Sequence, residues 1–537
     1  MKGSVLMVGT VWSLVPFAVV IPLAILTRQV IPGLLAGLMV GAWLLHPTLM
    51  GGLQATLAYL FKELEVPGNL RLIVFLYLFG SFVGLLRISG GVAGFARWIG
   101  VRIHSAKGAF AVTWLSSLLT FMAPDFRIIT VAPVMLPLLE RYRIRPYDMS
   151  YAINVTSTPL ISLVPLGTAF VGYMVGLLTT ALRHAGQPGS AYPLFLQSIP
   201  FNFFALAILA IGLYKSFIRR TASDAAPVGA VKGDAEVDGI AASSSRARRR
   251  AAARRQVAWA ETGTLGTDHG DRDDRGATAQ TSVTRVPGTN GSAAAGPDED
   301  PPEALQVLSE RARPSALHLV VPIALLVSLT LVLTWYSGVS HGGHGVAALV
   351  KADASEAMLQ AILVTLVVSS LLYIVRKMAL ARVLYGIVSG GNEMMNVILL
   401  LTLVWAVSGV ATDLGFTAFV GRGIGELIPK MWIAPALFVF GALLSYFIGS
   451  SFGAWGILMP LGFTLGTAAH VSLPLIAGAV FASGTLGGFA SPLSDNTVAM
   501  STVMRFPVMT FTRRLLPTTL IAGGAATAGY AVAGLWG

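Results

Sequence analysis

Residues 477–501 read AGAVFASGTLGGFASPLSDNTVAMS, an apolar stretch interrupted in its middle by proline, serine, aspartate and asparagine. The flanking residues are apolar enough to lie in a lipid bilayer, which needs about 20 such residues per helix. At that depth, a carboxylate and unpaired backbone groups are tolerated only where they are buried in protein or line a polar cavity. The stretch therefore predicts a membrane helix that is broken around Asp495.

The first half of the chain contains a counterpart of this stretch. Residues 151–172 read YAINVTSTPLISLVPLGTAFVG, in which PLGT (165–168) parallels PLSD (492–495). Upstream of each, MLPL (135–138) parallels LMPL (458–461), and the paired prolines are 28 and 32 residues apart. This duplication predicts two inverted repeats with helices that break around 123–130, 154–168, 449–456 and 490–497. Such an arrangement is typical of secondary transporters.

The composition extends this interpretation to the whole chain. Of its 537 residues, 55% are hydrophobic and 12% are charged, and the mean hydropathy is +0.73. We therefore expect an all-α polytopic membrane protein with about 11–13 transmembrane segments, some of them broken or re-entrant, and exclude a soluble enzyme. The chain contains no cysteine and no phosphate-binding GxxxxGKS/T motif. Nor does it show a convincing catalytic constellation, so we expect no enzymatic activity and no cofactor.

Residues 220–315 differ from the rest of the chain. They contain SRARRRAAARR (245–255) and PDEDPPE (297–303), with few residues able to form a core. We interpret them as a disordered cytoplasmic insert between an N-terminal membrane repeat (1–219) and a C-terminal membrane repeat (316–537). The net charge of +12 comes mainly from short basic loops such as 141–145 and 376–382. These loops mark the cytoplasmic side of a membrane protein and do not indicate nucleic-acid binding.

Five ordered segments carry a family resemblance. They are GSFVGLLRISGGVAGF (80–95), APDFRIITVAPVM (123–135) continuing into RIRPYDMSYAINVTSTPL (143–160), VWAVSGVATDLGFTAFV (404–420), GSSFGAWGILMPL (449–461) and SPLSDNTVAMST (491–502). They resemble the NhaC family of Na+/H+ antiporters, part of an ion-transporter superfamily that includes sodium-coupled malate/lactate exchangers. The resemblance implies antiport across a bacterial cytoplasmic (inner) membrane. Resemblance to the superfamily implies a homodimer.

The cluster around Asp495 is the first candidate site. Ser494, Asn496 and Thr497 surround this carboxylate with hydroxyl and amide oxygens, which are hard ligands. We therefore expect Asp495, Asn496 and Thr497 to bind Na+. The carboxylate can alternatively hold a proton, and this alternation is the chemistry of antiport. The competing explanation is an aspartate that caps a helix.

Asp125 and Arg127 form the second candidate, within FMAPDFRII (121–129). The two side chains predict either a neutralised structural pair or a gate that opens when a cation competes for the carboxylate. The resemblance implies acids one and two positions before Asp125, where this chain has Ala123 and Pro124.

The third candidate is the first-half break. Its polar residues are Asn154, Thr156, Ser157 and Thr158. The resemblance implies an aspartate at the position of Asn154, and often another at Gly488. Asparagine keeps a carbonyl oxygen for a cation but does not carry a proton at neutral pH. These departures leave the counter-ion and its stoichiometry open.

Two further segments match the family. Asp413 in ATDLG (411–415) is either a second ion ligand or a helix cap. Ser450 and Ser451 in GSSFGAWG (449–456) fit a re-entrant tip whose hydroxyls face the site, or a small-residue packing motif.

Three functions remain open on this evidence. The first is Na+/H+ antiport, with Asp495 as the main carboxylate and Asp125 assisting. The second is Na+-coupled transport of a small, malate- or lactate-like organic anion, favoured by the surplus of neutral oxygens and by Arg127, which could bind a carboxylate. The third is a nonconducting membrane scaffold whose Arg-rich insert recruits a partner.

Overall fold

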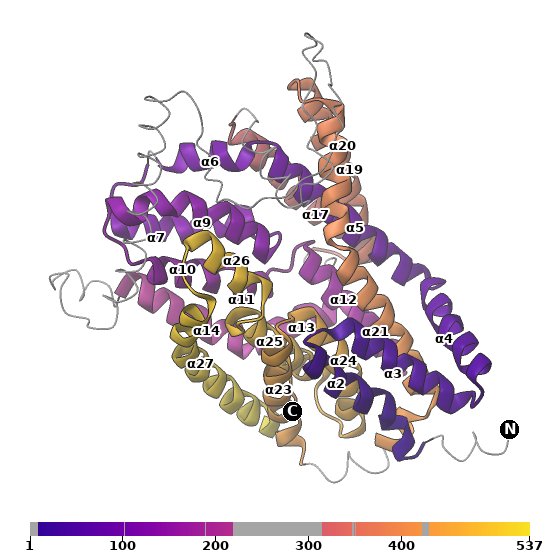
Figure 1. Cartoon of the computed structure of the whole chain (residues 1–537). Helices are drawn as coiled ribbons and strands as arrows, with labels where there is room; N and C mark the ends of the chain where they lie inside the picture. Colours follow the sequence, from indigo (N-terminus) through magenta and orange to yellow (C-terminus); the bar gives the residue numbers. More distant parts are fainter. Residues whose placement is uncertain are drawn as a thin grey trace, which may run out of the picture. The chain divides into compact units, whose positions relative to one another are not determined.

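The computed structural model describes residues 9–100, 102–187, 189–218, 314–345, 348, 351–420 and 429–536. Within these residues the regular elements are helices, with no strand among them, as the sequence predicts (Figure 1). The insert predicted at 220–315 lies outside the described residues except for Pro314 and Ser315. Its disorder and cytoplasmic location remain predictions.

The part of the chain before the insert contains short helices as well as long ones. In order they are η1 (Val11–Leu14), α2 (Val15–Thr27), α3 (Val30–Leu45), α4 (Leu49–Leu64), α5 (Pro67–Ile88), α6 (Gly91–Gly100), α7 (Ala106–Leu115), α8 (Ser117–Thr120), α9 (Pro124–Arg141), α10 (Pro146–Val155), α11 (Thr158–Ile161), α12 (Ala169–His184), α13 (Ala191–Ser198), η2 (Ile199–Phe201), α14 (Phe203–Leu213) and η3 (Tyr214–Ile218). Proline opens α5, α9 and α10, where its missing N–H and fixed φ suit the first helical position.

The part after the insert begins with α17 (Leu317–Ser340), α19 (Ala354–Val375), α20 (Leu380–Glu393), α21 (Met395–Asp413) and α22 (Phe416–Phe419). It continues with α23 (Lys430–Ile448), α24 (Ser451–Ala468), α25 (Leu473–Ala490), α26 (Asp495–Met504) and α27 (Val508–Trp536).

Seven described helical segments are long and apolar enough to cross a membrane, and the bent pair Ala191–Phe201 and Phe203–Ile218 makes a possible eighth. The polytopic class is therefore confirmed, but the count by length is below the 11–13 segments expected. The apolar stretch 150–178 is divided among α10, α11 and α12 and is not one continuous helix. The apolar stretch 70–96 is interrupted after Ile88, where Gly90 turns the chain with a φ of +72°. The short helices beside these breaks, such as α6, α10 and α11, do not span a membrane by themselves.

The paired sequence motifs occupy equivalent places in the structure. Helices α9 and α24 each follow a break, and each contains one of the paired prolines, Pro137 and Pro460. Helices α12 and α26 each follow a second break. Each begins at a hydroxyl cap, where Thr168 or Ser494 accepts a hydrogen bond from the backbone N–H three residues later. The same order of elements therefore occurs twice, as the sequence parallels predict.

These two sets of helices pack on one another. Helix α23 lies against α24 and α25, α24 lies against α12, and α26 lies against α9 and α10 (Figure 1). The broken segments of the N-terminal part are thereby brought beside those of the C-terminal part.

A second group of helices crosses at very short range. A Cβ added to Gly84 of α5 would lie 2.3 Å from the carbonyl oxygen of Gly386 in α20, and one added to Gly390 would lie 2.3 Å from that of Gly80. Small residues permit this backbone contact, as they do between many membrane helices. Helix α19 packs on α5, and α17 packs on α19.

Candidate functional site

Two chain breaks of the C-terminal part lie against each other. Gly449 and Ser450 join α23 to α24, and Gly449 adopts a φ of +80°. A Cβ at Gly449 would lie 2.6 Å from the backbone carbonyl carbon of Leu493, within the break between α25 and α26. Glycine is required both by this positive φ and by the close approach. Ser450 caps α24 by accepting a hydrogen bond of 3.1 Å from the Gly453 N–H.

Gly488 lies where α25, α24 and α11 converge. A Cβ at this position would lie 2.2 Å from Ser451 Oγ and 3.3 Å from Thr158 Cγ2. The Ser451 hydroxyl is fixed there by donating a hydrogen bond of 2.8 Å to the Gly484 carbonyl. An aspartate, which the family resemblance implies at Gly488, therefore has no room in this packing. The close contact between the two halves therefore requires glycine, and not aspartate, at position 488.

Two asparagines brace the two halves reciprocally. Asn154 of α10 donates through Nδ2 to the Phe489 carbonyl of α25 at 2.9 Å, and Asn496 of α26 donates through Nδ2 to Thr158 Oγ1 of α11 at 2.7 Å. Asn154 is 0% exposed and Asn496 is 8% exposed. The Oδ1 atom of each is buried and has no hydrogen-bond donor. Because a buried acceptor without a donor is costly, these two oxygens are the atoms of the site that most require a ligand.

Asp495 is the first residue of α26, and it is not the cap. Ser494 performs that role by accepting from the Thr497 N–H at 3.2 Å, while its own hydroxyl donates to the Gly488 carbonyl at 3.0 Å. The Asp495 side chain is exposed, and no hydrogen bond or ion pair with another described residue engages it. The capping explanation of Asp495 is thus wrong, because the preceding serine already satisfies the helix end.

Asp125 occupies the equivalent first turn of α9, which packs against α26. The carboxylates of Asp125 and Asp495 lie close enough to interact electrostatically. Each is placed at a helix N-terminus, where the backbone N–H groups favour negative charge. No group of three or more acidic or histidine side chains with metal-ligand geometry occurs among the described residues. A cation held here would therefore be bound largely by neutral oxygens.

Arg127 is fully buried and bonded only to uncharged oxygens. Its Nη2 donates to the Thr113 carbonyl at 2.7 Å and to Thr156 Oγ1 at 2.6 Å, and its Nε donates to the same Thr156 oxygen at 3.2 Å. Its Nη1 donates to Thr120 Oγ1 at 2.6 Å and to Ser116 Oγ at 3.4 Å.

The predicted ion pair between Asp125 and Arg127 is not formed in the described part of the chain. Residues two apart on a helix do not face each other, so Arg127 points into the packing around α7 and α8 while Asp125 remains at the start of α9.

The remaining candidate hydroxyls are engaged locally. Ser157 donates to the Ile153 carbonyl at 2.7 Å, and Thr497 Oγ1 accepts from Ser494 at 3.1 Å. Thr156 donates to the Ala152 carbonyl at 2.8 Å while accepting from Arg127.

Asp413 lies in a different cluster. It ends α21, where it accepts a hydrogen bond of 2.6 Å from the Tyr59 hydroxyl of α4. Nearby, Glu63 is 4% exposed and pairs with Arg183 at 2.6 Å. No local sequence signal marks Glu63 as buried, because its partners come from α5 and α12. One of those partners is Asn69, two residues after the proline that opens α5, which donates to the Glu63 carbonyl at 2.8 Å.

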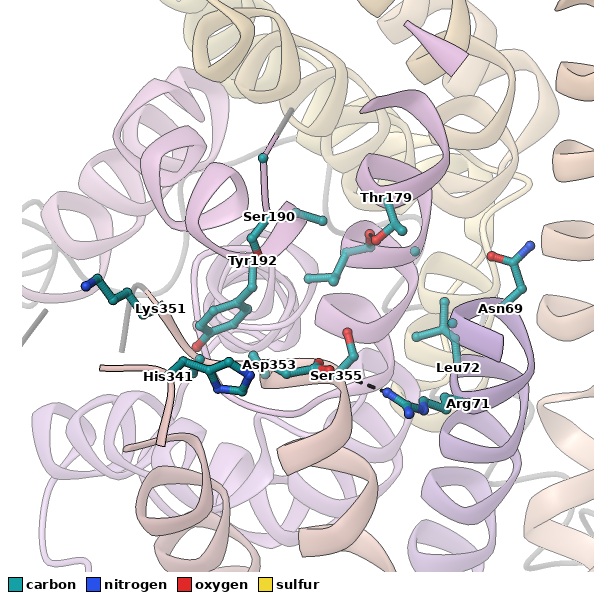
Figure 2. Close-up of a pocket in the computed structure, with 17 residues that line it drawn as sticks. Asn69, Arg71, Leu72, Thr179, Ser190, Tyr192, His341, Lys351, Asp353 and Ser355 are labelled. Carbon is teal, nitrogen blue, oxygen red and sulfur yellow. Dashed lines mark hydrogen bonds and ion pairs between the residues drawn. The ribbon is translucent and has the colours of Figure 1, made fainter. Parts of the chain in front are cut away.

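A cavity of about 420 Å³ lies outside the cluster that contains Asn154, Gly488 and Asn496. Arg71 pairs with Asp353 at 3.4 Å, and Figure 2 shows Tyr192 and Lys351 on the side of the cavity away from Arg71. Tyr192 also donates a hydrogen bond of 2.8 Å to the Pro165 carbonyl, in the loop that leads into α12. The cavity thereby touches the first-half break at its edge, although none of the sequence-predicted site residues lines it.

Comparison with known proteins assigns part of the chain to a family. The profile of the Na+/H+ antiporter family matches residues 282–535, which include α23 to α26. Residues 282–535 belong to the Na+/H+ antiporter family. The recognition made from the motifs is confirmed, and the chain is a membrane transporter of the secondary, antiporter type.

Three relatives of this chain have different names. An uncharacterized protein of Haemophilus influenzae is 22% identical over 98% of this chain and 91% of its own length. The arginine/ornithine antiporter ArcD of Halobacterium salinarum is 36% identical over 19% of this chain and 22% of its own. The malate-2H+/Na+-lactate antiporter of Bacillus subtilis is 27% identical over 24% of this chain and 28% of its own.

Two solved transporters share the fold of the antiporter chain. Neisseria gonorrhoeae MtrF superposes with a TM-score of 0.55 at 13% identity, covering 90% of this chain and 84% of its own. The YdaH transporter of Alcanivorax borkumensis superposes with a TM-score of 0.54 at 14% identity, covering 90% and 88%. At these identities the likeness concerns the fold alone.

Proposed function

We propose that the chain exchanges Na+ for H+ across a bacterial cytoplasmic membrane by alternating access. The observation that carries this proposal is the pair of buried amide oxygens without donors, Asn154 Oδ1 and Asn496 Oδ1. Helices α10 and α26, which carry them, pack on one another, and the carboxylates of Asp125 and Asp495 interact at the same group of helices. Na+ is a hard cation that prefers such oxygens. Asp495, Asn496 and Thr497 supply its principal ligands, and Asp125 assists.

The exchange follows from a single requirement on charge. During alternating access, the carboxylate at the start of α26 changes its exposure from one side of the membrane to the other at low cost only when a cation or a proton neutralises it. Na+ and H+ therefore compete for Asp495. The protein changes conformation with either ion bound, so Na+ that moves in one direction is exchanged for H+ that moves in the other. Ser494 and Ser450 cap the helices that follow the two breaks, and Ser451 joins α24 to α25 by donating to the Gly484 carbonyl.

Na+-coupled exchange of a small organic anion is the second candidate. It is favoured by the name of one relative, the malate-2H+/Na+-lactate antiporter. Against it stands the saturation of Arg127, all of whose described donors already have oxygens. An anion would have to be bound by hydroxyls and helix N-termini alone.

The deciding experiment uses purified protein in liposomes that contain a pH-sensitive dye. A Na+ gradient is imposed without organic acid, and then with malate, lactate, arginine or ornithine. We expect Na+-driven proton movement without any organic solute, and its loss in Asp495→Asn. Asp148→Asn is the matched control, because Asp148 lies in the first turn of α10 and pairs with Arg145 at 2.8 Å. Uptake of a labelled organic solute that follows Na+, without proton movement in its absence, would instead establish the second candidate.

A further inference from the structure

Arg127 is a buried cation without a buried anion. Its side chain is 0% exposed, and no carboxylate of the described residues lies within ion-pair distance of it. Burial of an unpaired charge is unfavourable, so such a residue persists where it has a function or where other charges compensate it at longer range. A guanidinium also stays protonated at neutral pH, so its charge is permanent.

The charges around the broken helices are few. The segments 108–139, 149–182 and 431–504, which include most of α7 to α12 and of α23 to α26, contain three charged side chains. These are Asp125, Arg127 and Asp495. Two carboxylates and one guanidinium leave a net charge of minus one, which a single monovalent cation neutralises.

The position of Arg127 keeps its charge next to the first-half break. Two of its nitrogens donate to Thr156 Oγ1, and Thr156 is two residues from Asn154, whose carbonyl oxygen has no donor. The guanidinium therefore raises the cost of placing a second cation near this break. Helices α24 to α26, which carry Asn496, contain no lysine or arginine.

We propose that Arg127 is a built-in cation of the N-terminal repeat that limits the core to one exchanged monovalent cation per crossing. The fixed guanidinium offsets one of the two carboxylates, so only one net negative charge is left for a cation to neutralise. The loaded core is then neutral, and exchange of one cation for another moves no net charge. This inference rests on the proposed function for its Na+ site, but it concerns the number of cations.

The wild-type protein supplies the first test. In liposomes whose membrane potential is set by K+ and valinomycin, isotopic Na+ uptake should rise with Na+ concentration at a Hill coefficient of about 1. The Na+ gradient at which Na+-driven proton movement stops should be independent of voltage. One net charge per cycle would shift that gradient about tenfold for every ~60 mV. A Hill coefficient of about 2, or a voltage-dependent end point, overturns the proposal.

Variants of Arg127 supply the second test. Arg127→Met leaves a net charge of minus two, so the Hill coefficient should rise toward about 2 and exchange should become voltage-dependent. Arg127→Lys keeps the charge and should behave as the wild type in both measurements. The double variant Asp125→Asn/Arg127→Met removes one charge of each sign and should return to voltage-independent exchange. Arg376→Met, in an exposed turn, is the control for loss of an arginine.

Each failure has a separate meaning. Na+-for-Na+ exchange measures the cation number without protons, so absence of proton coupling alone overturns the proposed Na+/H+ exchange and leaves the cation number measurable. Absence of any Na+ flux overturns both proposals. If Arg127→Met does not fold, the wild-type end point and the Arg127→Lys comparison still decide the cation number. Wild-type behaviour of a folded Arg127→Met protein would show that the guanidinium does not set the number of exchanged cations, and would overturn the proposal.

Discussion

At the scale of single residues, Asn496 combines two roles that substitutions can separate. Its amide nitrogen braces the two halves by donating to Thr158 at 2.7 Å, and its amide oxygen remains without a donor. Asn496→Ala should raise the apparent KM for Na+ by about tenfold, equivalent to about 1.4 kcal/mol. Thr158→Val removes this hydrogen bond between the halves but keeps the amide oxygen of Asn496. It should lower thermal stability, by about 1–3 kcal/mol for the unpaired amide, with a smaller change in KM.

The two variants of this pair are compared by Na+-dependent flux and by thermal unfolding in detergent. Equal changes of KM in both would indicate that the brace, and not the amide oxygen, controls Na+ affinity.

Gly488 and Ser451 offer a second residue-scale prediction. A Cβ at Gly488 would lie 2.2 Å from Ser451 Oγ but 3.6 Å from Ser451 Cβ. Gly488→Ala should therefore destabilise the protein by about 1–3 kcal/mol through overpacking. Adding Ser451→Ala removes the clashing hydroxyl, so the double variant should be more stable than Gly488→Ala alone. Thermal unfolding of the four proteins measures the coupling, and additive losses would contradict the packing described.

The polar residue types of the site could be predicted from the sequence, but their bonding could not. The oxygens at 154–158 and 494–497 stand out because they interrupt apolar runs. Neither the donation of Asn154 to Phe489 nor that of Asn496 to Thr158 has a sequence signal, because each joins residues more than 330 positions apart. The absence of an Asp125–Arg127 pair likewise follows from the helical directions of the two side chains, which a short motif does not convey.

At the scale of helices, the α5–α20 crossing leads to a third prediction. Gly84→Ala would place a methyl group 2.3 Å from the Gly386 carbonyl oxygen, and backbone on both sides leaves nothing that can rotate away. The two helices would have to separate, at a cost of about 1–3 kcal/mol or more. Gly68→Ala is the control at the start of the same helix, since no atom lies within 4 Å of its added Cβ. Similar melting temperatures for both variants would contradict this packing.

The helix breaks were more predictable than the number of spans. Proline, glycine and serine within apolar runs locate the breaks at 449–450 and 491–494, because these residues release or cannot continue the helical hydrogen bonds. The number of crossings depends on whether α10, α11 and α12 share one span. Hydropathy does not distinguish a broken span from a continuous one of the same composition.

At the scale of the whole molecule, the contacts between halves explain why a long insert is compatible with a single core. Asn154 reaches Phe489, Asn496 reaches Thr158, and α24 packs on α12, so the halves are joined by packing as well as by the chain. The duplication visible in the sequence predicted that equivalent elements exist. Their mutual contact depends on the three-dimensional pairing of α9 with α26, which no local pattern specifies.

Replacement of residues 221–297 by a Gly/Ser linker tests this separation of core and insert. The residues proposed to bind and exchange cations lie between Asp125 and Thr158 and between Ser450 and Thr497. Loops outside a packed core tolerate large changes, so Na+-driven proton flux per reconstituted protein should stay within about twofold of the wild type. A second variant with the insert sequence scrambled controls for composition. Loss of flux in a linker variant that keeps the wild-type melting temperature would assign the insert a direct part in function. Retained flux would exclude the scaffold hypothesis, in which recruitment by the Arg-rich insert is the purpose of the protein.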